Sequence, residues 1–240
     1  MTRLYRQVAS QIAWLIDTGE FNAPGRLPAE RHLSARLSVS RPTIREAIVA
    51  LELSGLVEVR AGSGVYVVNA SAARTISIDL IDNAGASPID VINARLNIEC
   101  AIIGDAVKNV SDEQLKRIMD AHAQMEKFEN RTDFQVADLE FHVTIAEATG
   151  NSVLSPIVEA LWTEMSSPMF MRMGHISGLV GENEPWAIKE HQAICDAFKT
   201  KDPEAAQKAM KAHLLHVKEI LQRDWNNSGT SGFDCLDAAE

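Results

Sequence analysis

One carboxylate and three histidines in the second half of the chain have the residue types of a divalent-metal site. Asp138 and His142 are four residues apart, so a helix would carry both side chains on one face. His191 and His213 fall in two further segments with helical periodicity. Converging imidazoles and a carboxylate would bind a divalent ion, for which zinc, nickel and manganese are all admissible. The same spacing also fits histidines that are satisfied in a helical core or exposed on its surface, and spacing alone leaves both interpretations open.

A second group of residues, near the N-terminus, has the chemistry of nucleic-acid binding. Residues 1–70 contain eight Arg, no Lys and six acidic residues, a balance of +2, whereas the rest of the chain has 15 basic and 27 acidic residues. A guanidinium can bond to phosphate or to a guanine edge through two parallel hydrogen bonds. This asymmetry predicts that DNA contact is confined to the N-terminal part, although the whole chain has a formal net charge of -10.

The elements expected around these arginines are three helices and a two-stranded wing. Helical periodicity predicts helices over 4–16 and 28–38, and a third helix after the N-cap residue Ser40 that ends at Gly55. Alternating valines predict two strands on either side of the glycine-rich turn at 61–64. The third helix would present its outer N-terminal surface to the bases, as a recognition helix does. The residues on that surface are Arg41, Thr43 and Arg45.

This segment closely resembles the DNA-binding domain of the GntR family of bacterial transcription regulators. The resemblance covers about residues 4–68 and is carried by LPAERHLSARLSVSRPTIREAIVALELSGLVEVRAGSGVYV. It implies a winged helix-turn-helix in which arginines contact phosphates and bases and a glycine lies in the wing. The expected DNA-binding residues are Arg31, Ser40, Arg41, Thr43, Arg45 and Gly62. The alternative is a small α+β domain whose arginines are solvated surface charges.

Beyond this domain the strand signals vanish and the pattern predicts an all-helical bundle. Helical periodicity covers 89–107, 111–129, 134–149, 152–165, 186–199 and 203–225. The predicted fold class is therefore multidomain and mostly α, with a winged helix-turn-helix (α+β) followed by an all-α bundle. The expected boundaries are 1–69 for the DNA-binding domain, 70–77 for a linker, 78–225 for the helical domain and 226–240 for a disordered tail.

The helical part resembles the FCD effector domain, which accompanies this DNA-binding type in the FadR subfamily. The resemblance covers about residues 78–222 and is carried by Arg95…Glu99, Asp138-Leu-Glu-Phe-His142, Gly150-Asn151, Glu190-His191 and Met210-Lys-Ala-His213-Leu. It implies that Asp138, His142, His191 and His213 bind a metal, with zinc favoured over nickel and manganese. Small carboxylic acids are frequent effectors of that family.

The same resemblance implies two effector-binding residues, each of which has a structural alternative. Arg95 would pair with the effector's carboxylate, since the two groups match in bidentate geometry. A salt bridge between Arg95 and Glu99, four residues apart, is the alternative explanation of this arginine. Asn151 is a further pocket residue by resemblance, and a helix C-cap accounts for it equally well.

A finer resemblance is to regulators of hexuronate operons within this subfamily. It is carried by 161–170, 172–176 and 190–194, together with Lys201-Asp-Pro203. It implies a uronate or related sugar acid as effector, with Arg172 and His175 lining the pocket. A solvated loop between helices is the alternative interpretation of these two residues.

The predicted function is a DNA-binding transcription regulator, acting as a repressor, that is controlled by a small carboxylate. A homodimer would bind a palindromic operator in double-stranded DNA. The chain is expected not to be an enzyme, because no HExxH, GxSxG or separate general base stands out. The alternatives are a metal-dependent enzyme that uses the Asp/His site and a DNA-binding protein without a ligand.

The expected location is the cytoplasm, with no membrane partner. No apolar stretch is long enough to cross a bilayer, and the N-terminus lacks the features of a signal peptide. Cys100, Cys195 and Cys235 are far apart and form no CxxC pair, which fits a reducing compartment.

Overall fold

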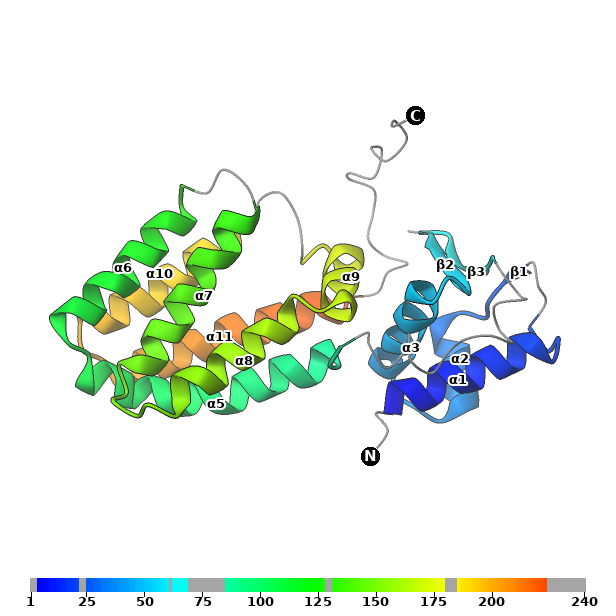
Figure 1. The fold of residues 1–240 in the computed structure, drawn as a ribbon, viewed down its shortest axis with the longest axis horizontal. Helices are drawn as coiled ribbons and strands as arrows, with labels where there is room; N and C mark the ends of the chain where they lie inside the picture. The colour runs from blue at the N-terminus through cyan, green and yellow to red at the C-terminus, as the bar shows by residue number, and fades with distance from the viewer. Residues whose placement is uncertain are drawn as a thin grey trace. The chain divides into compact units, whose positions relative to one another are not determined.

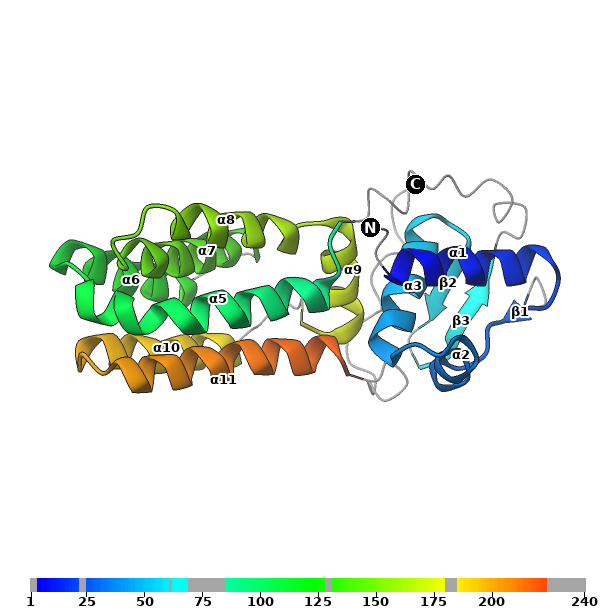
Figure 2. The same cartoon turned by 90° about the horizontal axis from the view of Figure 1, so that it is seen from below.

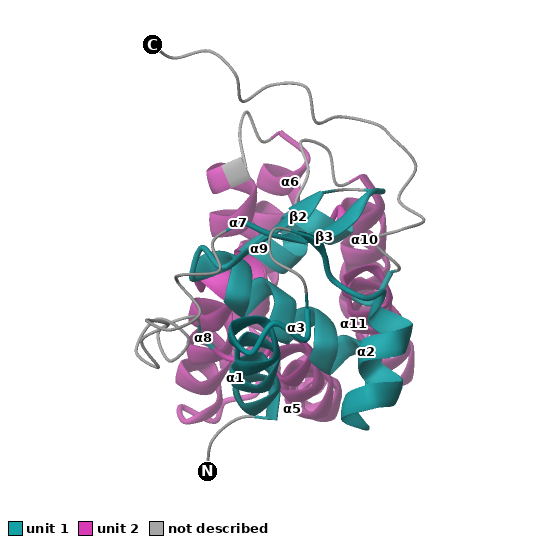
Figure 3. Ribbon diagram, turned by 90° about the vertical axis from the view of Figure 1, so that its right-hand side faces the viewer, with its two compact units in different colours: residues 1–85, 172–177, 222–240 teal, residues 86–171, 178–221 magenta. Residues whose placement is uncertain are grey.

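The structure is a computed structural model that describes residues 4–21, 25–60, 62–68, 85–127, 131–179 and 185–223. The predicted linker at 70–77 and the predicted tail at 226–240 lie outside these residues. The chain divides into two compact units, which Figure 3 colours separately. One unit consists of 1–85, 172–177 and 222–240, and the other of 86–171 and 178–221.

The first unit contains the helix-turn-helix and its wing (Figure 1). Its elements are α1 (Leu4–Asp17), β1 (Gly25–Arg26), α2 (Glu30–Leu37), α3 (Arg41–Leu53), β2 (Val57–Arg60) and β3 (Gly64–Val67). The strands form an antiparallel sheet in the order β1-β3-β2. α1 packs against α3, and both helices bury their apolar faces in the core of this unit.

Local sequence signals account for the ends of α3. The Ser40 hydroxyl accepts a hydrogen bond from the backbone N–H of Thr43 at 3.3 Å, and Pro42 lies in the first turn. Inside the helix, Ile44 and Ile48 are fully buried. Gly55 follows the helix with a φ of +74°, a left-handed conformation that favours glycine. These signals fix which face of α3 is left for a ligand.

The wing is a tight hairpin between β2 and β3. Gly62 at its tip has a φ of +67°. Gly64, at the start of β3, has a φ of +114°, and a Cβ there would lie 2.5 Å from Nε of Arg26. The conformation of the hairpin therefore favours glycine at Gly64, whereas the Arg26 side chain could move aside.

The second unit is built from helices. Of α9, only residues 168–171 belong to this unit, because residues 172–177 are part of the first unit. The helices are α5 (Pro88–Asn109), α6 (Asp112–Met125), α7 (Arg131–Glu147), α8 (Leu154–Met165), α9 (Pro168–Ser177), α10 (Pro185–Lys199) and α11 (Pro203–Leu221). α5 runs along α11, α7 packs against α6 and α8, and α10 packs against α11 and α6 (Figures 1 and 2). The predicted fold class is thus confirmed. The helix α9 occupies a segment that one interpretation of the sequence treated as a loop.

The core of the second unit places α7 between its neighbours. Phe141 and Phe198 are among its fully buried side chains, and Ala137 and Ile145 continue the buried face of α7. This packing fixes the rotation of α7 about its axis, so that its polar residues at the same interface face α10 and α11. His142 is one of these residues, and it is only 1% exposed.

Candidate functional site

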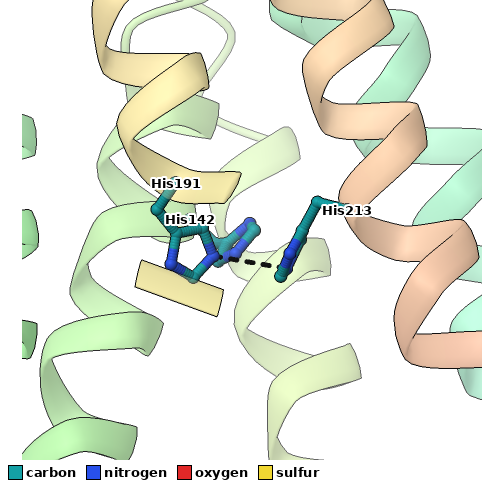
Figure 4. A group of neighbouring side chains, drawn as sticks. All are labelled: His142, His191 and His213. Atoms are coloured by element: carbon teal, nitrogen blue, oxygen red, sulfur yellow. Dashed lines mark hydrogen bonds between the residues drawn. The ribbon is translucent and has the colours of Figure 1, made fainter. Parts of the chain in front are cut away.

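Three buried histidines from three helices converge in the second unit. His142 lies on α7, His191 on α10 and His213 on α11 (Figure 4). One nitrogen of each ring lies within 4.8 Å of the others, and the Nε2 atoms of His191 and His213 are 3.2 Å apart. The sequence-based prediction named these residues, and the structure brings all three together.

Asp138 extends the cluster, one helical turn before His142. Its Oδ1 atom lies 3.4 Å from Nε2 of His142 and 3.4 Å from Nε2 of His191, and neither pair has hydrogen-bond geometry. Among the described residues, Asp138 Oδ1 and His142 Nε2 are buried without a hydrogen-bond partner. Buried polar atoms are normally satisfied, so an inward-facing acceptor pair of this kind fits a bound cation.

Two carboxylates orient the histidine rings from outside the cluster. Nδ1 of His142 lies 2.5 Å from Oε2 of Glu99, and Nδ1 of His213 lies 3.1 Å from Oε2 of Glu190. A carboxylate accepts, so each Nδ1 donates and the lone pair of a neutral ring resides on Nε2. Carboxylates that orient ligating imidazoles in this way are a common feature of protein metal sites.

Burial and neighbouring charges set the protonation states of the cluster. Burial beside His142 lowers the pKa of His213 to about 3, and burial beside His213 lowers the pKa of His191 well below its usual range. Burial would raise the pKa of Asp138, but the surrounding histidines hold it at about 2. Two neutral imidazoles and a charged carboxylate therefore face one another at neutral pH. These are the protonation states in which such groups bind a metal.

His142 differs from the other two histidines. Burial opposes its charge, but the carboxylate of Glu99 outweighs burial and raises its pKa. A metal that binds Nε2 must therefore displace a more tightly held proton from this ring than from the others.

A cavity of about 320 Å³ adjoins the cluster inside the second unit. Asp138 and His213 line it, so the cluster is open to the cavity on one side. Most of the other lining side chains are apolar or aromatic, and Trp162 and Trp186 are the largest of them. The indole Nε1 of Trp162 is buried and has no hydrogen-bond partner among the described residues. The cavity has the concave, largely apolar lining with few polar groups that small-molecule sites share.

Arg95 forms the salt bridge that was the alternative explanation of this residue, and its role in binding an effector stays a prediction. It lines the cavity, where its guanidinium lies 4.5 Å from the ring centroid of Trp162. It also forms the i,i+4 salt bridge with Glu99, with Nε donating to Oε1 at 2.6 Å. Arg95 is 1% exposed, and its positive charge at the cavity wall is already paired with the carboxylate of Glu99.

The other three residues expected at the effector site do not line this cavity. Asn151 is exposed, and its Oδ1 accepts from the backbone N–H of Val153 in the turn before α8. The guanidinium of Arg172 donates two hydrogen bonds to the carboxylate of Glu52, at 2.6 and 2.8 Å. His175 is exposed on α9. Asn151 is placed by its turn, Arg172 by its ion pair with Glu52, and His175 by its position on α9. The sequence resemblance specified none of these environments.

The residues expected to bind DNA lie in the first unit. Arg31, Ser40 and Gly62 are exposed, and the side chain of Arg41 is 44% exposed. Ser40 and Thr43 share a hydrogen bond of 2.8 Å between their hydroxyls. That these residues contact DNA stays a prediction.

Arg45 differs from the expectation that it lies on the outer surface of α3. It is 3% exposed, and its Nε donates to Oε2 of Glu30 at 2.9 Å. The physical reason is that Glu30, at the start of α2, provides a buried carboxylate that a buried guanidinium satisfies.

The sequence did not identify several residues around the histidine cluster. Glu99 was considered only as a partner of Arg95, and Glu190 only as part of a motif. Neither carboxylate is close in sequence to the histidine that it orients, so no spacing linked Glu99 to His142 or Glu190 to His213. Trp162 and Trp186 carried no such signal, because their place in the cavity depends on how helices pack.

A winged helix-turn-helix followed by an all-helical domain defines a class of DNA-binding regulators. Residues 4–67 match the bacterial regulatory proteins of the gntR family, and residues 90–216 match the FCD domain. The chain belongs to the GntR family and is a DNA-binding transcriptional regulator of the GntR/FCD type.

Its relatives are transcriptional regulators. The Exu regulon transcriptional regulator of Escherichia coli (strain K12) is 36% identical over 222 residues, which cover 91% of this chain and 84% of that protein. The Uxu operon transcriptional regulator of the same strain is 34% identical, covering 91% and 87%. The HTH-type transcriptional repressor NanR of Klebsiella aerogenes is 29% identical, covering 90% and 84%.

Two further expectations can be set beside these findings. The relatives bear out the prediction of a regulator rather than an enzyme. In the part of the chain that the structure describes, no helix has the length and apolar character needed to span a membrane.

Proposed function

We propose that this protein is a homodimeric repressor whose operator affinity is controlled by a small carboxylate bound at a metal in the helical unit. The observation that supports it most is the convergence of three histidines and Asp138 beside a cavity that also contains Arg95. The names of the relatives favour a hexuronate or a related sugar acid as the effector.

The metal would be held by Asp138 and by the Nε2 atoms of the three histidines. The donor set of nitrogen and carboxylate oxygen fits zinc best, and nickel and manganese are compatible with it. The ligands come from α7, α10 and α11, so an ion would be enclosed on the protein side and open towards the cavity. When bound, the metal supplies coordination positions for carboxylate and hydroxyl oxygens.

The protein residues of the cavity would select and orient the effector. Arg95 provides a positive charge at the cavity wall, next to Trp162. The aromatic side chains of Trp162 and Trp186 offer flat apolar surfaces, against which the C–H face of a sugar ring packs. Asn151, Arg172 and His175 are not part of this proposal, because they do not line the cavity.

Control of DNA binding would follow from linkage between two states of the dimer. Two recognition helices would bind successive half-sites of a palindromic operator. One state of the dimer would fit the operator well and the other poorly. An effector that binds the poorly fitting state more tightly lowers the affinity for DNA. The size of this effect is set by the ratio of the effector's affinities for the two states.

A binding titration tests this proposal. Operator DNA would be selected from random duplexes with the zinc-loaded full chain, and its affinity measured by fluorescence anisotropy. D-glucuronate or D-galacturonate should weaken DNA binding, whereas D-glucose, which lacks the carboxylate, should not. The variant His191→Ala should bind DNA but lose the response.

The outcomes separate the parts of the proposal. A response to other sugar acids or dicarboxylates, with none to either hexuronate, would overturn the hexuronate assignment alone. Absence of zinc in the metal-exposed protein, by elemental analysis, would overturn the metal site. Unchanged DNA affinity with every carboxylate would support a regulator without a ligand.

A further inference from the structure

The carboxylate of Glu99 pairs with both a proposed metal ligand and the cavity arginine. Its Oε2 atom lies 2.5 Å from Nδ1 of His142, and its Oε1 atom accepts from Nε of Arg95 at 2.6 Å. A weaker contact of 3.4 Å joins Oε2 to Nη2 of Arg95. Glu99 is 2% exposed, so these charged neighbours rather than water stabilise its carboxylate.

We infer that Glu99 is a positioning residue that couples the metal centre to the effector cavity, favouring metal and restraining the affinity for anions. The inference rests on the proposed function. On the metal side, Glu99 fixes the His142 ring with Nε2 directed at the cluster and adds a negative charge behind it. Both effects favour a cation, as carboxylates behind ligating histidines generally do.

On the cavity side, the same carboxylate has the opposite effect. Glu99 neutralises the charge of Arg95 along one edge of the guanidinium. A carboxylate that binds Arg95 from the cavity therefore meets a second negative charge directly behind the arginine. Like charges at short range in a poorly solvated site repel strongly, so Glu99 lowers the affinity for any anionic effector.

One conservative substitution separates the two effects. In Glu99→Gln the side chain keeps its size and one acceptor but loses its charge. Zinc affinity should fall about 10- to 100-fold, the usual cost of losing the carboxylate behind a ligand. At saturating zinc, carboxylate affinity should instead rise roughly tenfold, because one like charge near Arg95 is removed. A merely structural defect would lower both affinities together.

Glu190→Gln is the matched control. Glu190 holds Nδ1 of His213 as Glu99 holds Nδ1 of His142, and its other oxygen accepts from His216 at 2.7 Å. Glu190 is not a lining residue of the cavity. Its substitution should lower zinc affinity without the rise in carboxylate affinity at saturating zinc that is expected of Glu99→Gln.

The experiment uses the full chain and two probes. Zinc affinity is measured by competition with a chromophoric chelator, and acetate and D-glucuronate are titrated calorimetrically into the zinc-saturated protein. Opposite shifts in Glu99→Gln, with only the zinc shift in Glu190→Gln, are the expected result. If both variants change in the same way, or both affinities fall in folded Glu99→Gln, the coupling is overturned.

Two further measurements keep the outcomes distinct. If wild-type protein binds zinc but neither probe, the proposed function fails and the coupling fails with it. If Glu99→Gln does not fold, the neutral pair Arg95→Gln/Glu99→Gln removes both buried charges at once. Weakened zinc binding without a gain in carboxylate affinity is expected there, and unchanged zinc affinity would overturn the coupling.

Discussion

The two arginines at the start of α3 lie in different environments although they are only four residues apart. The side chain of Arg41 is 44% exposed and its Nη2 lies 3.7 Å from Glu30, whereas Arg45 is 3% exposed and hydrogen-bonded to the same carboxylate. A buried pair of this kind contributes to folding in a way that an exposed arginine does not. Weaker DNA binding would therefore indicate a lost DNA contact when Arg41 is replaced, but a destabilised domain when Arg45 is replaced.

We expect Arg45→Ala to destabilise the N-terminal unit and Arg41→Ala to leave it nearly unchanged. Removing Arg45 leaves the carboxylate of Glu30 buried without its main partner, which costs about 3–5 kcal/mol. Arg41→Ala should change stability by about 0.5 kcal/mol or less but weaken operator binding by about 1–3 kcal/mol if it contacts a base. Urea unfolding followed by circular dichroism, and DNA titrations, measure the two effects. Equal unfolding midpoints would contradict the buried pair.

The thiols of Cys100 and Cys195 should react slowly with alkylating reagents in the folded protein. Burial raises the pKa of Cys100 to about 11 and that of Cys195 to about 12, above the ordinary 9.0. The thiolate is the reactive form, so at pH 8 alkylation by iodoacetamide should be at least about tenfold slower than in the urea-unfolded chain. Peptide mapping by mass spectrometry measures both rates.

The pH dependence of these thiols has a definite sign. Because folding raises their pKa, the neutral thiols stabilise the native state fully below pH 9, and this contribution is lost as pH rises towards 11 and 12. Reactivity should therefore increase steeply only above the pH at which an ordinary thiol is already ionised. Equal rates in the folded and unfolded chains at pH 8 would show that the thiols are not protected.

At this scale, residue type and spacing predicted which side chains converge but not what holds them. The i,i+4 relation placed Asp138 and His142 on one helix face, His191 and His213 were named from two further helical segments, and resemblance supported the full set. The roles of Glu99 and Glu190 could not be predicted from sequence, because i,i+4 spacing does not say which helix that face meets. The burial of Arg45 was missed for the same reason.

At the scale of elements, the candidate ligands join three helices that are separate in sequence. α7, α10 and α11 each contribute at least one histidine, so an ion would cross-link them. Asp138 Oδ1 and His142 Nε2 are buried without hydrogen-bond partners among the described residues, so an ion bound there would satisfy both atoms. Metal binding should therefore stabilise the packing of the three helices against one another, and not only one of them.

Adding zinc should raise the melting temperature of the helical unit, and EDTA should lower it. A ligand at about 1,000 times its Kd stabilises the native state by about 4 kcal/mol. Differential scanning calorimetry of the full chain resolves the transition. Asp138→Asn serves as the control, because it keeps the shape of the side chain but weakens metal binding. A zinc-induced shift of equal size in this variant would show that the ion binds elsewhere.

Helix α6 offers a test of a purely local signal. The Ser111 side chain accepts from the backbone N–H of Gln114 at 3.2 Å, and the Gln114 side chain accepts from the backbone N–H of Ser111 at 3.1 Å. This reciprocal capping box stabilises the first turn, so Ser111→Ala should cost about 1 kcal/mol of unfolding free energy. Ser111→Asp should retain most of that stability, and chemical denaturation measures both variants. Full stability of Ser111→Ala would indicate that packing alone fixes this helix end.

Most helices were predictable because their apolar residues recur at helical spacing, and side-chain caps mark where some of them begin. Ser40, Ser87 and Ser111 each cap a helix in the structure. The exception is α9, whose short sequence PMFMRMGHIS was assigned no helical periodicity. A helix of ten residues with glycine near its end depends on tertiary packing more than on its own propensity.

At the scale of the whole molecule, charge is divided between the two parts of the chain. Residues 1–70 have a balance of +2, and the remainder has a balance of -12. The acidic remainder repels the phosphate backbone, which favours contact through the N-terminal domain alone. A single small domain with few cations makes few phosphate contacts, which is consistent with the proposed homodimer.

The spacing of half-sites in the operator tests the proposed homodimer directly. In a dimer the two recognition helices have a fixed separation, so half-sites must lie one helical turn, or a multiple of it, apart. Inserting about five base pairs between them moves one half-site to the opposite face of the duplex, since a turn is about 10–10.5 base pairs. The affinity for the altered duplex should fall to that of an isolated half-site. Anisotropy titrations of the two duplexes, with sedimentation of the complexes, measure this, and equal affinity would show that the chain binds as independent monomers.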